Sequence, residues 1–290
     1  MKVLKANQLD NNSPTGFLIS QFFFFFGSLP LTAAALIAFI FYKPIKPYRF
    51  TAITYIIVIG LFTIMKAKDY YAVGIYPVII AFGSICIDNL LKKKWRFTII
   101  SLLIIINIGV FAMTLRVVYP IYSPPEIREH AKIFERYGML RWEDGKNHIL
   151  PQDFADMTGW REMADISLAA YSAIPKEELE HTLIICNNYG EAGALNYYNR
   201  KKMPEAYSFN TDYIYWLPHL YRIDNLLIVG EKPGQKIIDL FKDCKLMGLV
   251  ENANAREYNT GVYLLTGSVP AFTGIFYNLV EERKKKLDIF

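Results

Sequence analysis

Four long apolar runs fill the first 119 residues of the chain. They cover residues 17–42, 48–65, 73–91 and 97–119. Each run approaches the roughly 20 apolar residues that a helix needs to cross a bilayer, so the pattern predicts four transmembrane helices. Pro30 interrupts the first run, which we expect to form a single kinked span. The alternative is an interfacial helix over residues 17–26 followed by a short span from Leu31.

Basic residues gather in two of the loops between these runs. One loop contains Lys43, Lys46 and Arg49, and the other contains Lys92, Lys93, Lys94 and Arg96. By the positive-inside rule both loops are predicted to be cytoplasmic, and we interpret their charge as a topology signal rather than as a site for lipid or nucleic acid. Residues 1–15, residues 66–71 and everything after Tyr119 are therefore predicted to lie on the outer side.

Beyond residue 119 the chain alternates between short helical and strand patterns. Strands are predicted at residues 182–186, 225–229, 245–250 and 262–266. Helices are predicted at residues 126–137, 159–174, 191–198, 235–242 and 272–286. Such alternation is typical of a small α/β domain whose largely parallel sheet carries packed helices. We therefore expect a transmembrane region over residues 1–119, a membrane α-helical bundle, and an extracytoplasmic α/β domain over residues 120–290.

Composition narrows the possible chemistry. The chain has 290 residues, a formal net charge of +5 and a mean hydropathy of +0.18, which averages an apolar half and a polar half. This charge is too diffuse to indicate a nucleic-acid partner. The cysteines Cys86, Cys186 and Cys244 and the 4 histidines lack the spacing of metal ligands, so no metal site is predicted. A bridge between Cys186 and Cys244 is the alternative to buried free thiols.

Residues 187–191 directly follow a predicted strand, which is the usual place for a ligand in such a sheet. Asn188, Tyr189 and Glu191 are therefore candidate substrate-binding residues, because Gly190 allows close backbone approach and the next helix offers free amides to an anion. The alternative is that this segment only makes the turn and begins the helix. The glycines match neither a P-loop nor a dinucleotide-binding fingerprint, so no cofactor is predicted.

An aromatic run at residues 213–218 contains Trp216. Its aromatic rings are suited to stacking on a sugar or to lying against the bilayer surface, and a packed loop of the domain is the alternative. No Ser/His/Asp set and no acid/base pair can be assembled from the sequence.

Several short motifs together resemble one enzyme family. They are KAKDYY at residues 66–71, IYP at 75–77, TGWRE at 158–162, NYGEAGA at 188–194 and NANARE at 252–257. In this order they are similar to the late membrane segment and the following domain of bacterial family 39 glycosyltransferases. These enzymes are of the GT-C type and are related to protein mannosyltransferases and aminoarabinose transferases. The resemblance covers most of the chain from about Phe17.

The resemblance implies a multi-pass protein of the bacterial inner (plasma) membrane that takes a sugar from a polyprenyl-phosphate carrier on the outer face. The family's catalytic acidic residue lies in the first outward loop of a longer membrane domain, and this chain has no matching loop. We therefore expect the carboxy-terminal portion of such a glycosyltransferase. It would be inactive alone or completed by a separate chain that carries the missing membrane portion. No catalytic residue is assigned, and Asp69 is not expected to substitute for the family's acid.

Residues 66–71 are the candidate contact with the carrier. Lys66 and Lys68 are expected to pair with its phosphate, and Tyr70 and Tyr71 to donate hydrogen bonds or to pack on its lipid. The alternative is an ordinary interfacial anchor of basic and aromatic residues. For the whole chain, the alternative is a membrane-anchored domain that performs no chemistry and binds a glycan or a protein partner. Membrane lipid is an expected partner under either reading, and nucleic acid is not.

Overall fold

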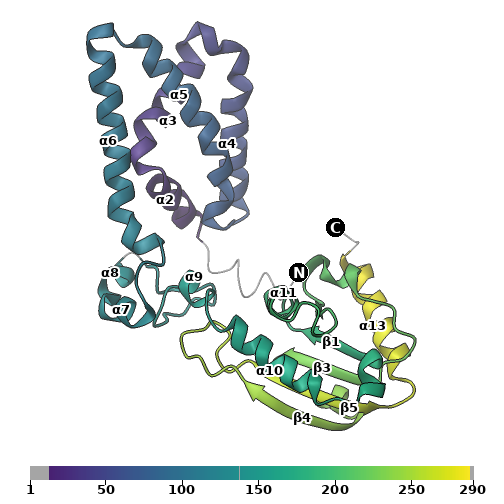
Figure 1. The fold of residues 1–290 in the computed structure, drawn as a ribbon. Helices are drawn as coiled ribbons and strands as arrows, with labels where there is room; N and C mark the ends of the chain where they lie inside the picture. The colour runs from purple at the N-terminus through teal and green to yellow at the C-terminus, as the bar shows by residue number, and fades with distance from the viewer. Residues whose placement is uncertain (1–12, 137, 288–290) are drawn as a thin grey trace. The chain divides into compact units, whose positions relative to one another are not determined.

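A computed structural model describes residues 13–136 and 138–287, and contacts within the chain divide it into two compact units, Met1–His148 and Ile149–Phe290 (Figure 1). The first unit is helical, and the second is built around a five-stranded sheet. The contacts divide the chain after His148. The boundary predicted at Tyr119 is where the chain is expected to leave the membrane, and it stays a prediction.

The helices of the first unit follow the apolar runs. They are α2 (Pro14–Phe24), α3 (Leu29–Phe41), α4 (Arg49–Ile64), α5 (Tyr76–Leu90), α6 (Lys93–Val118), α7 (Pro124–Glu129) and α8 (Ala131–Arg136). Short 3-10 helices at Phe26–Ser28, Lys43–Tyr48 and Asp69–Ile75 precede α3, α4 and α5. The single helix expected over residues 126–137 is instead the pair α7 and α8, because the backbone leaves helical geometry at His130 (φ −97°, ψ 16°). Its last residue, Tyr137, lies outside the described residues.

Three stretches of the described residues are long and apolar enough to cross a membrane: Lys43–Ile64, Asp69–Leu90 and Lys93–Leu115. The pair Pro14–Phe24 and Phe26–Phe41 also qualifies, but it is bent by 70° and is therefore a broken span or a re-entrant loop. These helices indicate that the chain associates with a membrane. The bend lies at Phe25 and not at Pro30, because Pro30 stands in the first turn of α3, where its missing N–H breaks no hydrogen bond.

Close contact between α3 and α5 depends on Gly83. A Cβ at this position would lie 1.9 Å from the carbonyl oxygen of Leu31, so the two backbones approach more closely than any side chain would allow. Small and apolar side chains of both helices, among them Ala35, Ala38 and Ile79, form the core beside this contact. Membrane helices commonly pack through such small residues, and Gly83 serves this purpose between α3 and α5.

Asn107 ties α6 to the rest of the unit. Its side-chain amide donates to the carbonyl oxygen of Gly27 at 3.0 Å, and the Ser28 hydroxyl donates to its Oδ1 at 2.8 Å. Gly27 makes room for this contact, because a Cβ there would lie 2.8 Å from that Oδ1. None of the most apolar window of the α6 span is buried inside the structure. In a bilayer, lipid or another membrane helix must therefore cover most of α6.

The second unit alternates helices and strands. Its helices are α9 (Gln152–Ala155), α10 (Trp160–Ser172), α11 (Tyr189–Tyr198), α12 (Gln235–Ile238) and α13 (Phe272–Leu287), with 3-10 helices at Lys176–His181 and Thr211–Trp216. Its strands are β1 (Thr182–Cys186), β2 (Tyr207–Ser208), β3 (Asn225–Gly230), β4 (Phe241–Leu249) and β5 (Gly261–Ser268).

The sheet has the order β2-β1-β3-β5-β4 and is mixed rather than largely parallel. β1 pairs in parallel with both β2 and β3, whereas β5 pairs antiparallel with β3 and β4. The prediction was wrong at one end because β4 begins at Phe241, inside the helix expected over residues 235–242, and that helix is the single turn α12. Most side chains of β4 are not buried, so its sequence lacks the apolar pattern of β1 and β3.

Side chains on both faces of the sheet are buried. On one face Ile184 and Leu227 lie in the core cluster that contains Met163 of α10 and Leu195 of α11. On the other face the alternate strand residues pack in a second cluster with Phe272, Phe276 and Val280 of α13. Burial on both faces explains why β1 and β3 are continuous apolar runs, and it fixes the position of the loops that leave them.

Candidate functional site

The loop after β1 lies between two strands, β2 and β3, that are added on opposite sides of β1. From β1 the chain passes through α11 to β2 on one side, and β3 pairs on the other side of β1. The loops that follow β1 and β3 therefore leave the same end of the sheet, at the position where open α/β sheets bind ligands. Asn187 and Asn188 follow β1, and Glu231 follows β3. This end of the sheet is the first candidate site.

A capping box fixes the start of α11. The Asn188 side-chain oxygen accepts from the N–H of Glu191 at 2.9 Å, and the Glu191 carboxylate accepts from the N–H of Asn188 at 3.0 Å. This reciprocal pair satisfies two backbone donors that a helix N-terminus leaves free. The sequence-based alternative for these residues, that they make the turn and begin the helix, is therefore confirmed as a structural role.

Glu191 is also buried, with only 2% of its surface exposed. Burial, together with the smaller effect of the charges of Glu257 and Glu231, raises the pKa of its carboxyl from 4.5 to about 8, although the N–H of Asn188 acts in the opposite direction. The desolvated carboxylate is the costly form, so Glu191 is mostly protonated at neutral pH. It supports the loop from inside and does not present a negative charge to a ligand.

Two distant motifs meet beside this loop. Gly159 of the TGWRE motif has φ +85°, and a Cβ there would lie 2.5 Å from the Cβ of Ala255 in the NANARE motif. The carboxylate of Glu162 accepts from the backbone N–H groups of Glu251, at 2.8 Å, and Asn252, at 3.3 Å. The start of α10 and the loop between β4 and β5 are thus joined by both packing and hydrogen bonds.

The third motif, NYGEAGA, closes the same arrangement. A Cβ on Gly190 would lie 3.3 Å from the ring edge of Trp160, whose indole N–H donates to the carbonyl oxygen of Asp156. The Asn188 amide reaches Glu257 Oε1 at 3.4 Å, at the end of the NANARE motif. Three segments that are more than 20 residues apart in the sequence therefore assemble around the carboxyl end of β1.

The outward groups of this site are few. Tyr189 exposes 57% of its surface, and Asn187 is also exposed. Trp216 is 62% exposed and packs against Tyr213 at a ring distance of 4.8 Å. Of the predicted binding residues, Asn188 and Tyr189 therefore lie at the end of β1, and Tyr189 is the more exposed of the two.

The second candidate site is the predicted carrier contact in the first unit, residues 66–71. Lys66 ends α4 in the left-handed region (φ +51°). Its N–H donates to the Thr63 carbonyl oxygen at 3.3 Å, and the N–H of Ala67 donates to that of Phe62 at 2.9 Å. This is the Schellman pattern that usually has glycine at the position of Lys66. The turn directs the chain back toward α5, and the side chain of Lys66 is exposed.

Lys68 is partly buried and forms an ion pair with Glu143. Burial acts to lower the pKa of the Lys68 ammonium, but the hydrogen bond and the charge of Glu143 outweigh it, and the pKa lies above its ordinary value. Lys68 therefore keeps its positive charge. Asp69 accepts from the Ser20 hydroxyl at 2.7 Å, and its backbone oxygen accepts from the Gln21 amide at 2.7 Å. Asp69 thus anchors α2 to this turn.

Tyr70 and Tyr71 are the exposed aromatic groups of the second site. They expose 57% and 51% of their surfaces and contact each other edge to face at 5.1 Å. Tyr71 also packs against Phe62 of α4 at 6.2 Å. The turn therefore carries two cations and two tyrosines at one end of the helical unit, next to the start of the candidate span Asp69–Leu90.

Sequence reasoning missed two residues that matter at these sites. Glu143 lies far from residues 66–71 in the chain, and nothing in the sequence marks it as the partner of Lys68. Glu257 closes the NANARE motif, but only the fold brings it to Asn188. Among the residues that the structure describes, no three His, Cys, Asp or Glu side chains are arranged to hold a metal ion.

Comparison of the chain with known protein families, with curated proteins and with solved structures finds no match. The resemblance to family 39 glycosyltransferases therefore rests on the motifs alone and stays a prediction.

Proposed function

We propose that the chain is the carboxy-terminal portion of a membrane glycosyltransferase that uses a polyprenyl-phosphate-linked sugar. One observation carries the proposal most directly. The three motifs of the α/β unit that resemble the family 39 enzymes pack together around the carboxyl end of β1, through Gly159, Trp160, Gly190 and Glu257. Motifs that resembled the family by chance would have no reason to meet at a single ligand-binding position.

In this proposal the turn at residues 66–71 holds the carrier phosphate. Lys66 and Lys68 supply positive charge, and charge-assisted contacts to phosphate are among the stronger hydrogen bonds in proteins. Glu143 keeps Lys68 protonated in the absence of the carrier, and the phosphate then shares or replaces this partner. Tyr70 and Tyr71 pack on the first isoprene units, at the level where aromatic residues favour the membrane boundary.

The α/β unit contributes binding groups rather than the acid or base. Asn188 and Tyr189 contact the sugar or the acceptor at the end of β1, while protonated Glu191 holds their loop in place. Trp216 offers an exposed ring for stacking on a sugar. The family's catalytic carboxylate is not assigned to any residue of this sequence.

A binding measurement tests the proposal. The full chain in lipid nanodiscs is titrated with a short-chain polyprenyl phosphate, and the double variant Lys66→Ala with Lys68→Ala is compared with wild type. The loss of two phosphate contacts is expected to weaken binding at least tenfold. The matched control removes two exposed lysines of the α/β unit, Lys202→Ala with Lys236→Ala, and should bind as wild type does. Equal binding by wild type and the Lys66/Lys68 variant would refute the proposal.

A second candidate function is a non-catalytic domain that binds a glycan, and the exposure of Trp216 favours it. Its test is titration of the full chain with free oligosaccharides that lack a carrier. Saturable binding that Trp216→Ala removes, together with no binding of polyprenyl phosphate, supports this second function over the first. Trp95→Ala, which removes an exposed tryptophan of the first unit, is the control.

A further inference from the structure

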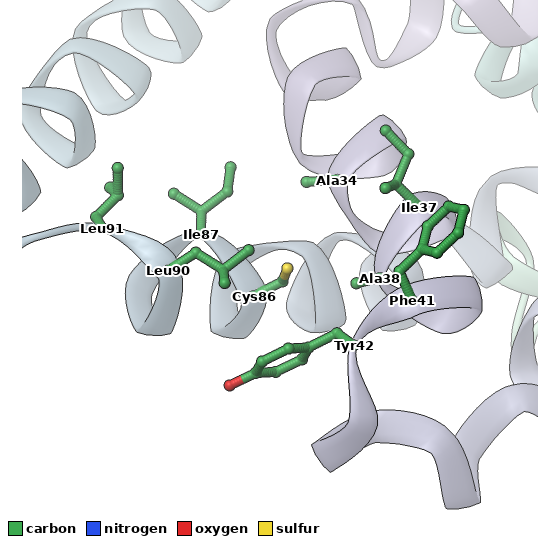
Figure 2. Close-up of a pocket in the computed structure, with 9 residues that line it drawn as sticks. All are labelled: Ala34, Ile37, Ala38, Phe41, Tyr42, Cys86, Ile87, Leu90 and Leu91. Atoms are coloured by element: carbon green, nitrogen blue, oxygen red, sulfur yellow. The ribbon is translucent and has the colours of Figure 1, made fainter.

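An apolar groove lies between the ends of α3 and α5, within the first unit. It encloses about 430 Å³. Figure 2 shows its lining, in which the small side chains Ala34, Ala38 and Cys86 leave room between larger ones such as Phe41 and Leu90. Pockets that hold small ligands usually have volumes of about 300–1,000 Å³. The groove is therefore large enough for an acyl chain, whereas a helix with its side chains is about 10–12 Å wide and would not fit.

Positive charge lies at one end of this groove. Tyr42 and Leu91 line it, and the next residues in the chain are Lys43 and Lys92, both exposed. Lys93 extends the charge into α6. The acid at this end, Asp88, already forms an ion pair with Arg96, so it does not cancel the lysines.

Arg49 does not add to the available charge. Its guanidinium donates to the carbonyl oxygens of Phe39, at 2.6 Å, and Ile40, at 2.5 Å, and so closes the C-terminal end of α3. Lys43 and Lys92 are therefore the cations best placed at the mouth of the groove. They lie at the opposite end of the helical unit from Lys66, because α4 connects the loop of Lys43 to the turn of Lys66, and α5 connects that turn to Lys92.

We propose that this groove binds an anionic phospholipid, with an acyl chain between α3 and α5 and the phosphate at Lys43 and Lys92. The apolar lining fits the chain, and the two lysines fit the negative headgroup. Basic pockets between membrane helices on the cytoplasmic side are a known way to hold such lipids, and the positive-inside rule places these loops on that side. The site is separate from the carrier contact at residues 66–71 and does not depend on it.

Native mass spectrometry of the full chain tests the proposal. The purified protein is titrated with phosphatidylglycerol and, in parallel, with phosphatidylcholine of the same acyl chains. Phosphatidylglycerol should be retained preferentially. Each lysine near an anionic headgroup contributes about fivefold in affinity, so Lys43→Ala with Lys92→Ala should lower the retention of phosphatidylglycerol by about 25-fold and leave that of phosphatidylcholine unchanged. Equal retention of the two lipids by wild type would overturn the proposal.

Two further variants separate the groove from general surface charge. Ala34→Phe fills the groove without changing its charge and should reduce retention of both lipids. Lys202→Ala with Lys236→Ala removes two exposed lysines of the other unit and should leave both lipids bound. If Ala34→Phe leaves lipid retention intact, the lipid does not occupy the groove and the proposal fails. If instead it converts a wild-type dimer into a monomer, a second copy of the chain occupies the groove, and the proposal also fails.

Discussion

Replacement of Glu191 by glutamine should make the α/β unit more stable than that of the wild type, by an amount that grows as the pH rises. Glutamine at this position still accepts a hydrogen bond from the N–H of Asn188, because either Glu or Gln serves in a capping box. The substitution therefore keeps the start of α11 and removes only the ability to ionise. Any pH-dependent difference between the two proteins then reports the cost of the buried carboxylate.

The magnitude follows from the two pKa values of Glu191, 4.5 as the ordinary value and about 8 in the folded protein. Because the folded pKa is the higher one, the folded state keeps the proton that the unfolded chain releases. The stability that this group contributes is fully present below pH 4.5 and is lost as the pH rises toward 8. One pKa unit corresponds to about 1.4 kcal/mol, so the wild type should lose about 3 kcal/mol relative to the variant between pH 4.5 and pH 7.

Cys186 provides the readout. It lies in β1 with 1% of its surface exposed, so a thiol reagent reaches it only when the sheet opens. In a background with Cys86→Ala and Cys244→Ser, the full chain in detergent is equilibrated with urea at each pH, and a short pulse of reagent at a fixed pH measures the unfolded fraction. The free energy of unfolding, obtained from these curves, should diverge between wild type and Glu191→Gln as the pH rises.

The control is Glu177→Gln, which removes an exposed carboxylate of the same unit and should follow the wild-type pH dependence. A constant difference between wild type and Glu191→Gln from pH 4.5 to pH 8 would show that Glu191 ionises as easily when folded as when unfolded. The burial argument, and with it the role of Glu191 as a neutral support of the loop, would then be wrong.

Three other outcomes are expected in the first unit. Gly83→Ala should lower the free energy of unfolding in detergent by about 1–3 kcal/mol, because the new Cβ would collide with the carbonyl oxygen of Leu31 in α3. Gly60→Ala is the control and should be nearly neutral, because a Cβ at Gly60 has no neighbouring atom within 4 Å. Asn107→Ala should release α6, which broadens the distance distribution between spin labels on α3 and α6. Glu143→Gln should strengthen polyprenyl-phosphate binding in nanodiscs up to about fivefold, because Lys68 loses a competing anion; weaker binding would contradict this.

The sequence predicted the segments that are apolar along their whole length. The last three apolar runs became helices near the expected bounds, the first became the bent pair α2 and α3, and β1 and β3 were found because both faces of each strand are buried. β4 was placed too late because most of its side chains are not buried, so Phe241–Leu249 contains polar residues that resemble a helix. The expectation of one span kinked at Pro30 misplaced the bend, because proline in a first helical turn bends nothing. The alternative of one helix over residues 17–26 and another from Leu31 is nearer to the observed pair α2 and α3.

The candidate sites could be predicted only where one segment supplies them. Asn188 and Glu191 are three residues apart, which is the spacing of a capping box. Glu143 and Glu257 come from other parts of the chain, and their roles depend on contacts that no local pattern specifies. The raised pKa of Glu191 likewise depends on its burial and on the charge of Glu257. Both follow from the fold, and no local sequence pattern indicates them.

The structure also changes what the family-like motifs can be taken to mean. Gly159 and Gly190 serve close packing, Glu162 holds the backbone of the loop after β4, and Glu191 caps a helix from inside. These four motif residues therefore support the loops around the carboxyl end of β1. Under the proposed function, specificity for a sugar or an acceptor is expected to come from outward groups such as Tyr189, so substitutions there, rather than at the glycines, should separate binding from folding.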